Sequence, residues 1–183
     1  MTHGQTIAIA SGKGGVGKTW FAITLAHALA RLGRRAMLFD ADLGLANVDI
    51  QLGLTPRLDL ATVISGKATV ADATLHCADG GFDIIAGRSG SGLLSAIDAA
   101  TVLVLSGGLD PAEAADVAHV HAAAGARLLV ATKLDLARRL GGILAAAGAE
   151  LALTEAGIGP GVADGLLPIT PAWLAARMLS GVS

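Results

Sequence analysis

Short apolar runs alternate along the chain with longer segments in which apolar residues recur at helical spacing. β-Strands are predicted for the runs at residues 6–11, 35–40, 81–87, 101–107, 127–133 and 150–153. Helices are predicted for residues 18–32, 58–66, 111–124, 136–147 and 171–179. Strands that alternate with helices are typical of βαβ units, so the pattern predicts an α/β protein with a parallel sheet.

The composition favours a buried sheet over a membrane-spanning chain. Hydrophobic residues make up 53% and charged residues 15% of the 183 residues, and the mean hydropathy is +0.64. Parallel strands that are covered on both faces read as continuous apolar runs, whereas no uninterrupted apolar segment reaches the roughly 20 residues of a bilayer span. The length is that of one ordinary domain, which we expect to extend over residues 1–183.

Charge and cysteine content exclude some classes of function and indicate a compartment. The net charge is −2 and no long basic run occurs, so sequence-specific binding to nucleic acid is not expected. The single cysteine, Cys77, cannot form an internal disulfide, and no basic-then-apolar secretory signal begins the chain. A reducing, cytoplasmic setting is therefore predicted.

A glycine-rich segment, GKGGVGKT, follows the first predicted strand and precedes the first predicted helix. It satisfies the phosphate-binding pattern G-x-x-x-x-G-K-[ST] in the context that this motif requires. Backbone N–H groups of such a loop surround phosphates, Lys18 reaches the β- and γ-phosphates, and Thr19 holds Mg²⁺. The predicted nucleotide-binding residues are Gly12, Gly14, Gly15, Val16, Gly17, Lys18 and Thr19. The structural alternative is a tight strand-to-helix turn without a ligand.

The stretch KGGVGKT carries a second lysine, Lys13, and resembles the deviant Walker A motif of the MinD/ParA family of ATPases. In that family the second lysine reaches across a dimer interface to the nucleotide of the partner. The resemblance implies that Lys13 and Lys18 are both catalytic residues, with Lys13 sensing a nucleotide-dependent homodimer. The alternative is a solvated surface lysine. Trp20 departs from the threonine or serine that is common at this position.

Two further stretches, LFDADLGLANVDIQLGL at 38–54 and GGFDIIAGRSGSGLL at 80–94, resemble the flagellar-number (FlhG-type) members of the same family. The likeness extends over about residues 5–97. It implies that Asp40 joins Thr19 in holding Mg²⁺ and that Asp42 is the catalytic carboxylate that positions the attacking water. The alternative is that both aspartates only terminate a strand.

One expected element is missing from this pattern. The family has a strand that ends in an aspartate supporting Mg²⁺, followed by the switch II loop, whereas Asp83 begins a predicted strand and Arg88 stands near the expected aspartate position. After residue 94 the chain passes almost directly to the next strand. We therefore expect hydrolysis to be slow or absent.

The second half of the chain resembles the signal-recognition-particle type of GTPases, including the flagellar GTPase FlhF. The resemblance rests on three stretches, at residues 98–120, 128–135 (LLVATKLD) and 157–179. It implies that Asp135 accepts hydrogen bonds from the guanine N1–H and amine, with Lys133 along the base plane. The alternative is that Lys133 and Asp135 only cap the next helix.

The sequence therefore predicts a three-layer P-loop NTPase fold with a mostly parallel central sheet flanked by helices. The leading hypothesis is a weakly hydrolysing, ATP- and Mg²⁺-dependent dimerisation switch that positions a flagellum or division site through a flagellar or cell-division protein. A GTP-binding protein of the signal-recognition type and a degenerate regulator without turnover are the alternatives. Membrane association stays open, because the last helix lacks a basic face apart from Arg177 and its apolar residues, Trp173, Leu174, Met178 and Leu179, favour core packing.

Overall fold

The computed structural model describes residues 5–41, 46–87, 100–161 and 165–180. The chain divides into two compact units, of which the first is Met1–Phe21 with Asp98–Ser183 and the second is Ala22–Ile97. The division falls inside helix α1 (Lys18–Arg31).

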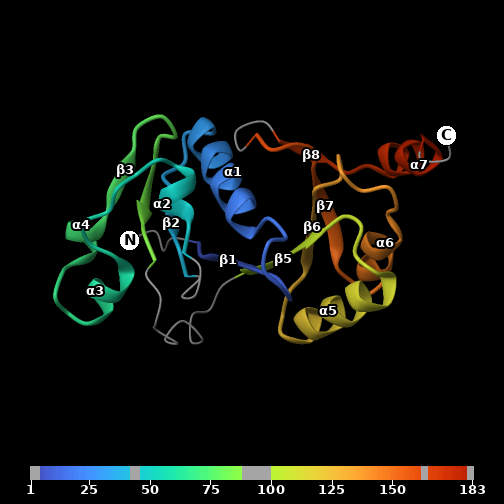
Figure 1. Cartoon of the computed structure of the whole chain (residues 1–183), viewed down its shortest axis with the longest axis horizontal. Helices are drawn as coiled ribbons and strands as arrows, with labels where there is room; N and C mark the ends of the chain where they lie inside the picture. Colours follow the sequence, from blue (N-terminus) through green and yellow to red (C-terminus); the bar gives the residue numbers. More distant parts are fainter. Residues whose placement is uncertain (1–4, 42–45, 88–99, 162–164, 181–183) are drawn as a thin grey trace. The chain divides into compact units, whose positions relative to one another are not determined.

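The first unit contains a five-stranded sheet with the order β1-β5-β6-β7-β8 (Figure 1). Its strands are β1 (Ile7–Ala10), β5 (Ala100–Ser106), β6 (Leu128–Thr132), β7 (Ala152–Gly157) and β8 (Leu166–Pro168). The first four strands are parallel and β8 is antiparallel to β7. The carboxyl ends of four strands therefore lie along one edge, where open α/β sheets bind their ligands.

Three helices pack against this sheet: α5 (Pro111–Ala123), α6 (Gly141–Ala147) and α7 (Pro171–Ser180). Leu103 and Leu129 of the sheet are fully buried, and Trp173 and Leu174 of α7 pack against the same core. Burial of the apolar faces of strands and helices provides the main driving force for this arrangement. Core packing of α7 is confined to its first half, because Leu179 is 77% exposed.

The second unit contains a three-stranded sheet with the order β2-β4-β3. Strand β2 (Met37–Phe39) runs parallel to β4 (Phe82–Ile85), and β3 (Leu75–Cys77) runs antiparallel to β4. Three short helices accompany these strands: α2 (Val48–Gln51), α3 (Leu60–Ile64) and α4 (Val70–Ala73). A small cluster of Leu60, Ala73 and Ile85 packs α3 and α4 beside the sheet.

The short helices are defined by their capping residues. The Asp59 carboxylate accepts a hydrogen bond from the Thr62 N–H at the start of α3, which satisfies one of the unpaired N–H groups of a helix end. Thr69 and Asp72 form a reciprocal capping box on α4. The hydrogen bonds from Thr69 hold the pKa of the Asp72 carboxyl below its ordinary value.

The observed elements follow the predicted order, with differences at short and irregular segments. The elements α2, α4, β3 and β8 are not predicted, and each has only three or four residues. Helix α6 begins at Gly141 instead of residue 136, because residues 134–136 form a turn. Strand β7 begins at Ala152 instead of residue 150, since Glu150 has φ +62°, which is incompatible with a strand.

Within the described residues, no helix combines the length and the apolar character that crossing a bilayer requires.

Candidate functional site

The loop between β1 and α1 has one open and one packed side. Gly15 and Gly17 have φ values of +71° and +100°, which side chains rarely tolerate. A Cβ added at Gly14 or Gly15 would meet nothing within 4 Å. This side of the loop is therefore free to receive a ligand against its backbone.

The other side of the loop is anchored to the carboxyl end of β6. The Thr132 hydroxyl donates to the carbonyl oxygen of Val16, and Val16 is only 2% exposed. A Cβ at Gly17 would lie 3.2 Å from Thr132 Oγ1, and one at Gly12 would lie 2.8 Å from the Val117 methyl groups on α5. Close packing beneath the loop thus accounts for two of its glycines.

Lys18 extends back over the loop that precedes it. Its ammonium donates to Ser11 Oγ at 3.0 Å and lies 3.5 Å from the Lys13 carbonyl oxygen. Thr19 is half-buried in the first turn of α1, where the N–H groups have no partners within the helix. A cation, an open run of backbone and a helix N-terminus at one place fit the polyphosphate of a nucleotide.

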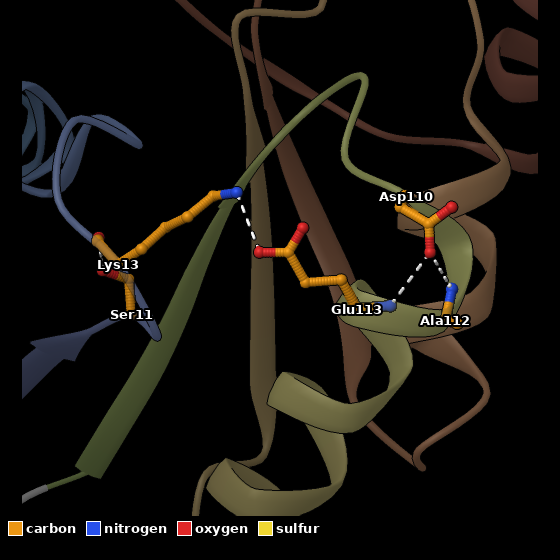
Figure 2. A network of polar contacts seen from close by, with 5 residues as sticks. All are labelled: Ser11, Lys13, Asp110, Ala112 and Glu113. Atoms are coloured by element: carbon orange, nitrogen blue, oxygen red, sulfur yellow. Dashed lines mark hydrogen bonds and ion pairs between the residues drawn. The ribbon is translucent and has the colours of Figure 1, made fainter.

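Lys13 has a different partner from Lys18. Its ammonium donates to Glu113 Oε1 on α5 at 2.9 Å, and both side chains are 48% exposed (Figure 2). Asp110 caps the start of α5 by accepting from the N–H groups of Ala112 and Glu113. Glu113 is thereby fixed at the first turn of a helix, and Lys13 spans the space between the loop and α5.

The T-K-x-D segment lies beside the same loop. The Lys133 ammonium donates to the carbonyl oxygen of Gly15 at 2.7 Å, and the left-handed backbone at Lys133 turns the chain out of β6. Asp135 is exposed two residues further along. The structure therefore brings two of the sequence-predicted groups together, the glycine loop and Lys133, and it leaves the Asp135 carboxylate accessible to solvent.

The acidic residues predicted for the metal and the water belong to the second unit. Asp40 is 7% exposed, and its Oδ2 accepts from the N–H groups of Asn47 and Val48 at 2.9 and 3.1 Å. Asp40 thus organises the start of α2. Asp42 lies outside the described residues.

Asp83 is a member of β4 and does not stand at its carboxyl end. Its Oδ1 lies 2.8 Å from Nδ1 of His76 on the neighbouring strand β3. The site of Arg88, which follows β4, is outside the described part of the chain.

Two residues that contact the loop and one in the first turn of α1 are not among the predicted site residues: Thr132, Glu113 and Trp20. The sequence places Thr132 in the T-K-x-D motif without a contact of its own and assigns no role to Glu113 or Trp20. The indole Nε1 of Trp20 donates to the Pro160 carbonyl oxygen at 3.1 Å. Each contact joins residues at least 100 positions apart in the chain, and Thr132 and Val16 are 116 apart. The local spacing of residues therefore does not predict these contacts.

Comparison with known proteins supplies the family. The profile described as "CobQ/CobB/MinD/ParA nucleotide binding domain" matches residues 7–162. Antiactivator FleN of Pseudomonas aeruginosa is 56% identical over 87 residues, which are 48% of this chain and 31% of FleN. Flagellum site-determining protein YlxH of Helicobacter pylori is 37% identical over 97 residues, 53% of this chain and 33% of YlxH. These matches span about a third of the length of the curated relatives.

Solved structures share the fold at low sequence identity. The septum site-determining protein MinD of Pyrococcus horikoshii, complexed with Mg-ADP, superimposes with a TM-score of 0.69 at 21% identity, over 97% of this chain and 86% of MinD. The signal recognition particle receptor FtsY of Elizabethkingia anophelis, in complex with GDP, gives a TM-score of 0.62 at 20% identity, over 97% of this chain and 64% of FtsY.

These findings bear out the predicted fold class and the predicted relationships. The chain has an α/β P-loop NTPase fold with a mostly parallel sheet flanked by helices, and its structure is similar both to MinD and to a GTPase of the signal-recognition type. The family profile extends over most of the chain and includes the loop with Lys13 and Lys18. The chain is therefore a member of the CobQ/CobB/MinD/ParA nucleotide-binding family.

Proposed function

We propose that this chain is a nucleotide-dependent dimerisation switch of the MinD/ParA/FlhG type, which binds ATP with Mg²⁺ and hydrolyses it slowly. The proposal treats residues 1–183 as one nucleotide-binding domain. The observation that carries it is the separation of the two lysine ammonium groups. Lys18 lies over its own loop, whereas Lys13 extends to Glu113 on another element and remains half-exposed.

The strength of the Lys13–Glu113 ion pair supports a role for Lys13 between two subunits. A pair in which both side chains are 48% exposed contributes only about 0–1 kcal/mol, since water screens it and two flexible side chains must be ordered. A phosphate of a second subunit would offer Lys13 a charge-assisted contact in place of the Glu113 carboxylate. Lys13 can therefore exchange the Glu113 carboxylate for such a phosphate at a small cost in free energy.

The proposed roles of the site residues are those that the resemblance to the MinD/ParA family implies. Backbone of Gly12, Gly14, Gly15, Val16 and Gly17 holds the phosphates together with Lys18, and Thr19 and Asp40 hold Mg²⁺. Asp42 positions the attacking water, and Lys13 completes the site of the partner subunit. The metal ion supplies charge neutralisation at the β- and γ-phosphates. Slow turnover is proposed because Asp83, the only aspartate of β4, is engaged by His76.

The similar proteins suggest what the switch positions. YlxH is named as flagellum site-determining and MinD as septum site-determining. We extend this to a flagellum or a division site as cargo, with a flagellar or cell-division protein as partner. The buried, unpaired thiol of Cys77 is compatible with the cytoplasm as the proposed location.

The test compares the oligomeric state of variants by light scattering coupled to gel filtration, with Mg²⁺ and a non-hydrolysable ATP analogue. Lys13→Ala is expected to bind the analogue within about twofold of the wild type and to remain monomeric. Glu113→Ala removes the resting partner of Lys13 and is expected to dimerise at least as well as the wild type. Lys18→Ala is the control that loses nucleotide altogether. Dimers of Lys13→Ala at wild-type strength would refute the proposal.

A second candidate is a GTP-binding protein of the signal-recognition type, favoured by the contact between Lys133 and Gly15. This contact links the segment that would read guanine to the loop that would hold the phosphates, and it leaves Asp135 exposed at the site. Competition between ATP and GTP for one site decides, because a carboxylate that reads guanine discriminates by well over tenfold. In that case Asp135→Ala should reduce GTP affinity to that of ATP.

The remaining alternative is a regulator that holds nucleotide without turning it over. Steady-state phosphate release by the wild type that exceeds the Lys18→Ala background would exclude it. Release equal to that background, together with ATP-dependent dimers, would retain the switch and remove the ATPase activity from the proposal.

A further inference from the structure

The residue directly after Thr19, Trp20, lies against a segment more than a hundred residues further along the chain. Its indole Nε1 donates to the Pro160 carbonyl oxygen at 3.1 Å. Trp20 is half-buried, although it belongs to the first turn of the helix whose N-terminus faces the predicted phosphate site. A large aromatic side chain therefore connects the start of α1 with the loop that follows β7.

Two glycines of that loop leave the space that the ring occupies. A Cβ added at Gly157 would lie 3.0 Å from Trp20 Cζ3, and one added at Gly165 would lie 2.4 Å from Trp20 Cζ2. Neither glycine has a positive φ, so conformational freedom does not explain why glycine stands there. Close packing explains it, because a side chain at either position would meet the ring, and one at Gly165 would also meet the Gly161 carbonyl oxygen at 2.3 Å.

The described ends of this loop are also held to each other and to β6. The N–H of Ile158 donates to the Gly165 carbonyl oxygen at 3.0 Å, and the N–H of Leu134 donates to the Gly157 carbonyl oxygen at 2.9 Å. Residues 157–160 and 165 thus form a segment, here termed the Trp20 clasp, that borders the T-K-x-D turn. Trp20, which belongs to the helix that follows the phosphate loop, packs against this segment.

The Trp20 clasp follows the carboxyl end of β7, at the edge of the sheet where a ligand is expected. β1, β6 and β7 are parallel and end at the same edge of the sheet, which is the edge that binds ligands in open α/β sheets. A polyphosphate in the loop after β1 would place its sugar and base along this edge, toward Lys133 and the end of β7. Lys133 already contacts Gly15 at 2.7 Å, so the two regions are adjacent.

We propose that Trp20 is a positioning residue for the nucleoside half of the ligand. The indole holds the Trp20 clasp against the start of α1, so that the base-side backbone is in place before the phosphates bind. Preorganisation of this kind raises affinity by removing the cost of ordering a loop on binding. The inference rests on the proposed function only in requiring that a nucleotide binds at the glycine loop, and it holds for either base.

The test separates the base side from the phosphate side by using a ligand without a base. Calorimetric titration in Mg²⁺ compares non-hydrolysable ATP and GTP analogues with inorganic tripolyphosphate. Trp20→Ala is expected to lose at least tenfold in affinity for the nucleotide that the wild type prefers and less than twofold for tripolyphosphate. Trp20→Phe keeps a ring but loses the donor to Pro160, and an intermediate loss is expected. Trp173→Phe, remote from the loop, should bind all three ligands as the wild type does.

The outcomes are distinguishable. Equal losses for nucleotide and tripolyphosphate would overturn the inference, because they would mean general damage to the phosphate loop, and unchanged nucleotide affinity would overturn it as well. A wild type that binds none of the ligands would refute the proposed function and this inference together. If circular dichroism finds Trp20→Ala unfolded, the same comparison is decided by Trp20→Phe.

A second readout does not need a change at the site. The chain has two tryptophans, so Trp173→Phe leaves Trp20 as the only emitter. Binding of the nucleotide analogue is expected to change the emission of Trp20, whereas tripolyphosphate should leave it as in the free protein. The same response to both ligands, or a response to neither at saturating nucleotide, would contradict a role on the nucleoside side.

Discussion

The phosphate loop offers a matched pair of substitutions, Gly14→Ala and Gly15→Ala, whose effects on stability can be calculated. At both positions an added methyl group would meet nothing within 4 Å, so no clash enters for either variant. Both variants gain about 0.4–1 kcal/mol because alanine restricts the unfolded chain. They differ in the folded backbone, since Gly15 has φ +71° and a residue with a Cβ costs about 1–2 kcal/mol there.

The gain in the unfolded state cancels between the two variants, and the strain at Gly15 remains. Gly15→Ala is therefore expected to be less stable than Gly14→Ala by about 1–2 kcal/mol, a factor of roughly 5–30 in the folding equilibrium. Urea unfolding without nucleotide measures this difference, provided that both variants have the wild-type slope. Equal midpoints, or a less stable Gly14→Ala, would contradict the positive φ of Gly15.

Two further predictions concern buried anchors. Thr132→Val leaves the Val16 carbonyl oxygen without the Thr132 hydroxyl as donor and should lower the free energy of unfolding by about 1–3 kcal/mol. Thr132→Ser keeps the hydroxyl and should lower it by only about 0.8 kcal/mol, for one methyl group. Titration with tripolyphosphate should detect weaker binding in the valine variant alone. Asp40→Ala should cost about 1.5–3 kcal/mol because two N–H groups lose a charged acceptor, while Asp40→Asn, whose amide oxygen can still accept, should unfold near the wild-type midpoint. If Asp40 also holds the metal, both variants should weaken the Mg²⁺ dependence of nucleotide binding. A variant that changes stability but not this dependence would limit Asp40 to its role at the start of α2.

The elements that position the phosphate loop could be predicted from sequence because their signals are local. β1, the loop and α1 are consecutive, and the glycine and lysine spacing of residues 12–19 is itself the physical requirement for wrapping backbone around phosphate. Helix α5 is predicted from the helical spacing of residues 111–124, and the structure places Pro111 in its first turn after the Asp110 cap. Such features depend on neighbours within one helical turn.

The parts that could not be predicted depend on partners that are distant in the chain. β3 and β8 have three residues each and are strands only because β4 and β7 pair with them, so no internal periodicity marks them. The alternatives for Lys133 were a base contact or a helix cap, and the structure places its ammonium on the Gly15 carbonyl oxygen. The spacing of T-K-x-D contains no information about a loop that precedes it by more than a hundred residues.

The phosphate half and the base half of this chain resemble different nucleotide-binding proteins, yet their contacts join them physically. Consecutive residues of the T-K-x-D segment, Thr132 and Lys133, bind the carbonyl oxygens of consecutive loop residues, Val16 and Gly15. The shape of the loop, and with it the affinity for phosphates, therefore depends on residues that the second resemblance assigns to the base. A substitution at Lys133 should consequently weaken tripolyphosphate as well as nucleotide, whereas one at Asp135, which is exposed, should affect only the choice of base.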